Sequence, residues 1–141
     1  MAQHHVHVHY HSTRPLAQCF DLLADHNRLG PILGAEVRRI HDGTGVGGVN
    51  GVGSVRTLTI AKLVCFDETV TGVRPNERID YRISRGAYPI VNHSGHVDFA
   101  GDEKGCTIDW SIDFDSKLPL AGTLIAAVLK AGISHGLRGH L

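Results

Sequence analysis

The sequence lacks an excess of charge of either sign, and it has few cysteines. Its 141 residues include 14 lysines and arginines and 14 aspartates and glutamates, so the formal net charge is zero with histidine neutral. Without a net field there is little to attract nucleic acid or an anionic membrane, and we expect no nucleic-acid partner. The three cysteines, Cys19, Cys65 and Cys106, lie far apart without Cys-x-x-Cys spacing. This pattern favours reduced thiols in a cytoplasmic protein over a disulfide framework.

Long hydrophobic runs are also missing. The N-terminus has no apolar signal core, and the longest apolar stretch, residues 118–129, is shorter than a bilayer-spanning helix requires. We therefore predict a soluble cytoplasmic protein without integral membrane association. The chain has neither tandem repeats nor low-complexity linkers, and its length suits one domain with its own core. We expect a single domain over residues 1–141, and the sequence leaves homo-oligomerisation open.

The sequence does contain strand and helix signals, beginning near the N-terminus. Residues 4–11, HHVHVHYH, alternate histidine with apolar side chains at the period of a β-strand. A first helix is predicted over about residues 14–25, with Ser12 or Thr13 as its cap and Pro15 in its first turn. The Pro- and Gly-containing segment that follows allows one short helix or turn.

The remainder of the chain predicts a sheet followed by a helix. Six strands joined by short turns fill residues 35–115, and a long helix starts at Pro119. The apolar side of that helix is predicted to consist of Leu120, Leu124, Val128 and Leu129. This order fits an α+β fold in which one curved antiparallel sheet wraps a helix.

The order of elements and several stretches of sequence resemble the START-like superfamily, also called SRPBCC, and within it the polyketide cyclase/dehydrase-like branch. The matching stretches are VHVHYHSTRPLAQCFDLLAD, GVGSVRTLTI, DETVTGVRPNERIDYRISRGAYPI and CTIDWSIDFDSKLPLAG, and the resemblance covers nearly the whole chain. It implies the helix-grip (START-like, Bet v 1-like) fold, in which a curved seven-stranded antiparallel sheet closes round a long C-terminal helix. The fold leaves a deep cavity for an apolar or amphipathic ligand. Because the superfamily includes lipid carriers, hormone and flavonoid binders and cyclases, function must be argued from the site.

Alternation within the predicted strands indicates which side chains face this cavity. A tight turn sets Arg56 opposite Glu68 on the inner face. One row across the sheet is expected to contain Arg56, Glu68, Tyr81, Gly95 and Trp110, with His93 beside it. The residues predicted to contact a ligand are Arg56, Glu68, Tyr81, His93, Trp110, Phe66 and Phe114.

The inward polar residues have more than one interpretation. Arg56 and Glu68 either satisfy each other and fix the strand register, or Arg56 and His93 bind the polar end of an otherwise apolar ligand. In the second case Tyr81 and Trp110 pack on the rings of the ligand. His93 is either a hydrogen-bonded wall residue or a general acid or base, because an unperturbed histidine titrates near neutral pH.

These interpretations lead to different functions. In the first, the domain binds a small hydrophobic or aromatic molecule, lipid-like or polyketide-like, without a cofactor. In the alternative, it is a polyketide cyclase or dehydratase in which His93 moves a proton and Arg56 stabilises an enolate oxygen. The sequence does not decide whether the protein is an enzyme. In a third interpretation side chains nearly fill the cavity and the domain acts through surface contacts, which a volume far below roughly 300 Å³ would favour.

The strand alternation also predicts where the N-terminal histidines point. If Val6 and Val8 join the interior, the outer solvated face carries His5, His7, His9 and His11. Asp109 or Asp113 would lie near them if the first and last strands pair, and such a group could chelate a metal. No cysteine or carboxylate has diagnostic spacing, so no metal site is predicted.

Glycines mark two further regions. Residues 43–48, GTGVGG, match GxGxxG only as a string, because the run leads into a strand instead of opening a helix for a phosphate. We predict a hairpin at the cavity mouth there. In the last helix, Gly122 and Gly132 are expected to leave room for a ligand, whereas Gly136 and Gly139 fit either that role or fraying.

Overall fold

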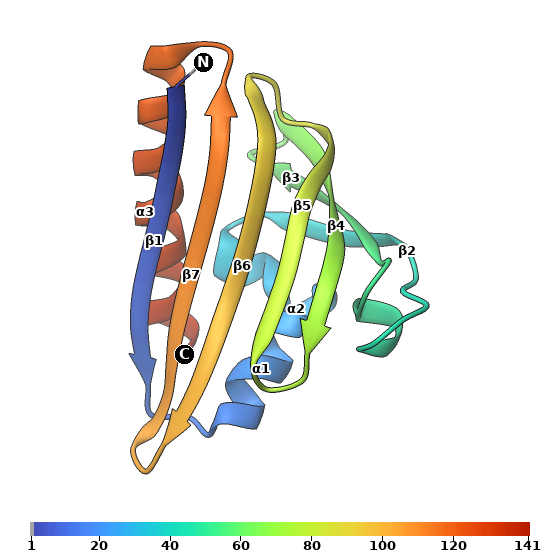
Figure 1. Cartoon of the computed structure of the whole chain (residues 1–141), viewed down its shortest axis with the longest axis vertical. Helices are drawn as coiled ribbons and strands as arrows, with labels where there is room; N and C mark the ends of the chain where they lie inside the picture. Colours follow the sequence, from blue (N-terminus) through green and yellow to red (C-terminus); the bar gives the residue numbers. More distant parts are fainter. Residues whose placement is uncertain (1) are drawn as a thin grey trace.

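The computed structural model describes residues 2–141. In chain order its elements are β1 (Ala2–Ser12), α1 (Leu16–Ala24), α2 (His26–Leu33), β2 (Glu36–His41), η1 (Gly48–Asn50), β3 (Val55–Ile60), β4 (Val64–Arg74), β5 (Arg78–Gly86), β6 (Ile90–Asp102), β7 (Gly105–Ser116) and α3 (Pro119–His140). The seven strands form one antiparallel sheet in the order β1-β7-β6-β5-β4-β3-β2. Figure 1 shows the sheet curving, with α3 running beside β1 and the two short helices behind the middle strands. The predicted α+β helix-grip fold is confirmed.

Strict alternation in β1 and β7 creates the inner face that carries the core. Every second residue of β7 is buried, which places Ile108, Trp110, Ile112 and Phe114 inside. Val6 and Val8 of β1 are buried beside them. Because side chains alternate along a strand, His5, His7 and His9, which alternate with these valines, must point outward.

The outer face of β1 and β7 carries the predicted histidine column. Nδ1 of His5 lies 2.7 Å from the Asp113 carboxylate, and Nδ1 of His9 lies 2.7 Å from that of Asp109. Nε2 of His7 approaches the same Asp109 oxygen at 3.0 Å. These pairs are solvent-exposed, so each contributes little to stability. Within residues 2–141 no group of three or more His, Cys, Asp or Glu side chains is placed to hold a metal ion.

The starts of the short helices differ from the prediction. The N-cap of α1 is Pro15, without a side-chain hydrogen bond. The predicted cap Ser12 instead accepts a hydrogen bond from the Arg14 backbone N–H at 3.0 Å, outside the helix. The α2 helix begins after Asp25, whose side chain caps it, and ends at Gly34 in a left-handed conformation with φ of 64°. These two caps fix the sharp direction changes on either side of α2.

The buried side of α3 matches the predicted apolar side only in part. Its fully buried residues are Gly122, Ile133, Gly136 and Leu137. A Cβ at Gly136 would overlap the Ile32 carbonyl oxygen, so this glycine lets α3 approach the backbone of α2. Of the predicted residues, Leu129 is half-buried and packs against the core, whereas Leu124 and Val128 are exposed and Leu120 is 88% exposed. By length and composition α3 could cross a membrane, but here it is the core helix of the fold.

Candidate ligand-binding cavity

A cavity of about 460 Å³ lies between the sheet and α3. Its wall is mostly aliphatic and aromatic, from β3 to β7, the end of α2, the β5–β6 connection and α3. The apolar side chains of the wall include Leu33, Leu58, Ile83, Ile90, Ile112, Ile125, Leu129 and Ile133. This volume lies within the range of small-molecule sites. It contradicts the interpretation in which side chains fill the interior.

The mouth of the cavity is identified by residues that both line it and remain exposed. They belong to the β3–β4 turn, the β5–β6 connection and the outer side of α3, and they are Ile60, Val64, Tyr88, Leu124 and Val128. The glycine-rich segment does not line this cavity. Gly47, Asn50 and Gly51 instead border a second cavity of about 40 Å³ next to α1. The prediction that the glycine-rich segment lies at the main cavity mouth is therefore wrong.

Arg56 and Glu68 form a buried ion pair at the boundary between the two cavities. They are directly opposite in the β3–β4 register, as predicted. Nε and Nη2 of Arg56 donate to the same oxygen, Oε1 of Glu68, at 3.0 and 2.9 Å. Glu68 lines the large cavity, whereas Arg56 lines the small one. The carboxylate, and not the guanidinium, therefore faces the large cavity.

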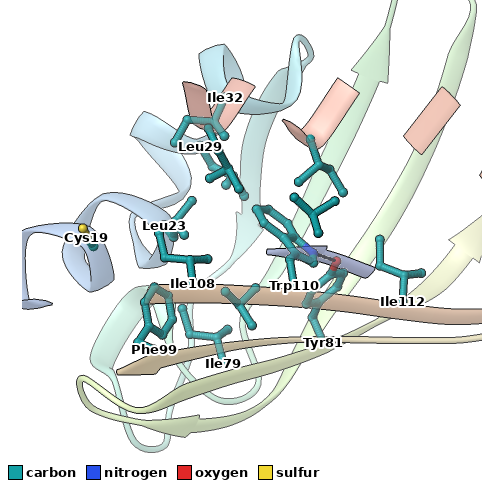
Figure 2. Close-up of a cluster of buried hydrophobic side chains, with 14 of the residues drawn as sticks. Cys19, Leu23, Leu29, Ile32, Ile79, Tyr81, Phe99, Ile108, Trp110 and Ile112 are labelled. Atoms are coloured by element: carbon teal, nitrogen blue, oxygen red, sulfur yellow. Dashed lines mark hydrogen bonds between the residues drawn. The ribbon is translucent and has the colours of Figure 1, made fainter. Parts of the chain in front are cut away.

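Tyr81 and Trp110 form a second buried polar pair. The Trp110 indole N–H donates to the Tyr81 hydroxyl oxygen at 2.7 Å, and Figure 2 shows the two side chains meeting inside the hydrophobic cluster. Tyr81 is paired with Gly95, and a Cβ at Gly95 would lie 2.4 Å from the Tyr81 ring. The Tyr81 ring therefore fills the space that a side chain at position 95 would occupy. The predicted straight row is only partly correct, because Trp110 pairs with Val97.

His93 is held by a backbone hydrogen bond. The Ile83 N–H donates to its Nδ1 at 3.0 Å. A register shift between Val91 and Ser94 frees His93 from regular pairing, and its ring centre lies 5.6 Å from that of Tyr81. Burial lowers the pKa of His93 to about 4, so the ring is neutral at pH 7. Since an N–H can only donate, Nδ1 must be the unprotonated nitrogen and Nε2 carries the proton.

Burial also changes the acidity of two other groups. It raises the pKa of the Glu68 carboxyl, and the adjacent Arg56 charge opposes this change. The pKa of Tyr81 is also raised, first by burial and then by the negative charge of Glu68. The Tyr81 hydroxyl therefore stays protonated and can act as a donor. Arg56 lies 5.3 Å from the Tyr81 ring centre, within cation–π range.

The structure brings most of the predicted site residues together. Five line the large cavity, namely Phe66, Glu68, Tyr81, His93 and Trp110. Arg56 and Phe114 do not line it. Phe114 is buried next to β1, where its ring stacks on that of His4 at 5.2 Å.

Sequence reasoning missed His26. Its side chain is buried, both ring nitrogens lack a hydrogen-bond partner, and its pKa is lowered to about 3. Burial is the main cause, followed by the charges of Arg56 and Arg39. His26 opens α2 directly after the cap, so no periodic pattern in the sequence could have indicated its burial.

Known proteins of similar sequence or structure share this architecture. The fold is that of hydrophobic ligand-binding and polyketide-cyclase-type proteins. A family model described as "Polyketide cyclase / dehydrase and lipid transport" matches residues 3–139, and the chain belongs to that family. The predicted SRPBCC membership is thereby confirmed, and the family suggests small hydrophobic ligands. None of the curated proteins matches the sequence.

Solved structures with the same fold include proteins of different kinds. Ara h 8.0201 is 21% identical, with a TM-score of 0.71, covering 99% of this chain and 97% of its own. Norcoclaurine synthase from Thalictrum flavum, solved with dopamine and hydroxybenzaldehyde, is 17% identical, with a TM-score of 0.64 and coverage of 99% and 89%. The di-domain ARO/CYC StfQ from the steffimycin biosynthetic pathway is 12% identical, with a TM-score of 0.79, covering 96% of this chain and 48% of its own. At these identities the likeness concerns the fold.

Proposed function

We propose that this protein binds a small, largely apolar molecule in the cavity between the sheet and α3. The observation that carries the proposal is the cavity itself, which has a volume of about 460 Å³, a mostly apolar wall and an open mouth. Its few polar side chains are Glu68, Tyr81, Tyr88, His93 and Trp110. An apolar wall with a few fixed polar groups is typical of sites that enclose a ligand and orient one end of it.

The geometry favours binding over the alternative cyclase or dehydratase reaction. A histidine that acts as a general base needs an unprotonated ring nitrogen that is free to accept a proton, and a pKa near the working pH. His93 has a pKa of about 4, and its unprotonated nitrogen is occupied by the Ile83 N–H. Arg56 would need to reach a developing oxyanion, but it is paired with Glu68 behind the cavity wall. The roles assigned to these two residues in the reaction therefore find no support.

We also retain the prediction of a cytoplasmic location. Cys19, Cys65 and Cys106 are all free thiols in the described chain. Free cysteines are typical of reducing compartments.

Blocking the cavity tests the proposed function. Gly132 lines the cavity, and a Cβ there meets no heavy atom within 4 Å, so Gly132→Phe places a ring in the free space. Replacing a helical glycine does not weaken α3 by itself. We expect wild type to bind the apolar fluorophore N-phenyl-1-naphthylamine and Gly132→Phe to bind it at least tenfold more weakly.

The matched control is Gly139→Phe. Gly139 lies on the same helix, also has open space at its Cβ, and does not line the cavity. This variant should bind the fluorophore like wild type. Equal binding by wild type and a folded Gly132→Phe variant, as judged by circular dichroism, would show that the fluorophore binds elsewhere.

A further inference from the structure

We infer that the ligand of the large cavity is uncharged and that its polar end is a hydroxyl group, which donates to Glu68 and accepts from His93. The inference rests on the proposed function and adds the chemical class of the ligand. It also excludes carboxylates, including fatty acids, as ligands.

Glu68 and His93 each line the cavity and each has a polar atom that takes no part in the hydrogen bonds described above. Both contacts of Arg56 that form the ion pair, from Nε and from Nη2, are to Oε1 of Glu68 and not to Oε2. The hydrogen bond of His93 to Ile83 is through Nδ1 and leaves Nε2 on the other side of the ring. The buried side-chain atoms that are both sealed and unpaired within residues 2–141 belong to His4, His26 and Ser54. Oε2 of Glu68 and Nε2 of His93 are not among these sealed atoms, and both residues line the cavity.

The two atoms have opposite hydrogen-bonding character. A carboxylate oxygen accepts, whereas the protonated Nε2 of His93 donates. The two residues meet at Ile83, because Glu68 is its register partner on β4 and His93 binds its backbone N–H from β6. A hydroxyl both donates and accepts, so a single group in front of Ile83 can satisfy both atoms.

The charge balance of the wall selects against ionised ligands. Among the described residues that line the cavity there is no lysine or arginine, and Glu68 is the one acid. Its charge is already neutralised by Arg56 behind it. A ligand carboxylate would meet Glu68 without a cation of its own, and a ligand ammonium would leave an excess positive charge beside the pair. Both cases bury an uncompensated charge, which an alcohol avoids.

Three ligands with one ring system test the inference on the wild-type protein. They are 2-naphthalenemethanol, 2-naphthylmethylamine and 2-naphthoate, and each is titrated against bound N-phenyl-1-naphthylamine at pH 7. We expect the alcohol to displace the fluorophore at least tenfold more effectively than the carboxylate, with the ammonium weaker than the alcohol. If the carboxylate or the ammonium competes as well as the alcohol, the inference is overturned. If wild type does not bind the fluorophore at all, the proposed function itself fails.

A double variant tests whether Glu68 causes the preference for the alcohol over the carboxylate. Glu68→Gln alone would leave Arg56 buried and unpaired, so the test uses the double variant Arg56→Met/Glu68→Gln. We expect the affinity of this variant for 2-naphthoate, relative to its affinity for 2-naphthalenemethanol, to be about tenfold higher than in wild type. The control is Glu103→Gln in the exposed β6–β7 turn, which should retain wild-type selectivity. Unchanged discrimination in a folded double variant would contradict the role of Glu68, and thermal unfolding establishes whether it is folded.

Discussion

The polar side chains inside the sheet differ in how completely they are paired. Arg56 with Glu68, and Trp110 with Tyr81, are donor–acceptor pairs within hydrogen-bond distance. Their inward direction could be predicted because strand alternation fixes it. The sequence could not predict which of the two ion-pair partners reaches the large cavity. That depends on side-chain conformation and on where the cavity ends.

His26 is the least satisfied of the interior polar groups, and we predict that it makes stability depend on pH. Its pKa is about 3 in the folded protein, against 6.5 for a free histidine. Below pH 6.5 the unfolded chain binds a proton that the native protein does not, so the stabilisation present above pH 6.5 is lost as the pH falls towards 3. His26→Phe should reduce the slope of the unfolding free energy between pH 6 and pH 4 by about 1.4 kcal/mol per pH unit. Urea unfolding at several pH values measures this slope.

His93 contributes to the same dependence, with a pKa of about 4. The His26→Phe variant should therefore keep part of the slope, down to about pH 4. A slope identical to that of wild type would mean that His26 is protonated in the native protein, contrary to its burial among arginine charges.

The strands and helices could largely be predicted from periodicity and turn residues. The first strand, the six later strands and the start of α3 at Pro119 follow directly from these signals. The register was predicted between β3 and β4, where the turn is short, but not across β4 and β5. There two irregularities, one between Asp67 and Glu68 and one between Val70 and Gly72, shift the pairing. A bulge inserts one residue without a marked sequence signal, so it escapes a parity argument.

The buried side of α3 could be predicted only in part, because the helix packs partly through its glycines. Small residues let backbones approach closely. Of the predicted apolar residues, Leu129 then lines the cavity, Leu124 and Val128 lie at its mouth, and Leu120 is exposed. We predict that Gly136→Ala destabilises the fold by about 1–3 kcal/mol, because the new Cβ overlaps the Ile32 carbonyl oxygen. Chemical denaturation measures the change.

Gly139→Ala provides the comparison within the same helix. It has open space at its Cβ, so the substitution should stabilise the protein by about 0.5–1 kcal/mol through helix propensity alone. Similar effects of both substitutions would show that the close contact between α2 and α3 is not formed in solution.

For the whole molecule, the order of elements was sufficient to predict the fold, and the family match confirms it. The number and the volumes of the interior cavities could not be predicted from the order of elements. One large cavity and one small cavity lie on either side of the Arg56–Glu68 pair. Their volumes result from the close approach of α3 and from the position of the β5–β6 connection, which are tertiary features. The apolar wall and the polar atoms of Glu68 and His93 together support binding of a neutral amphipathic molecule.

The indole N–H resonance of Trp110 provides the most direct test of whether a ligand enters the large cavity. Trp110 is the single tryptophan of the chain, and it lines the cavity with its N–H bonded to Tyr81. Titration of ¹⁵N-labelled protein with 2-naphthalenemethanol should shift this resonance in wild type and in Gly139→Phe, and leave it unchanged in Gly132→Phe. An indole resonance that does not move in wild type while the alcohol binds would contradict binding in the cavity.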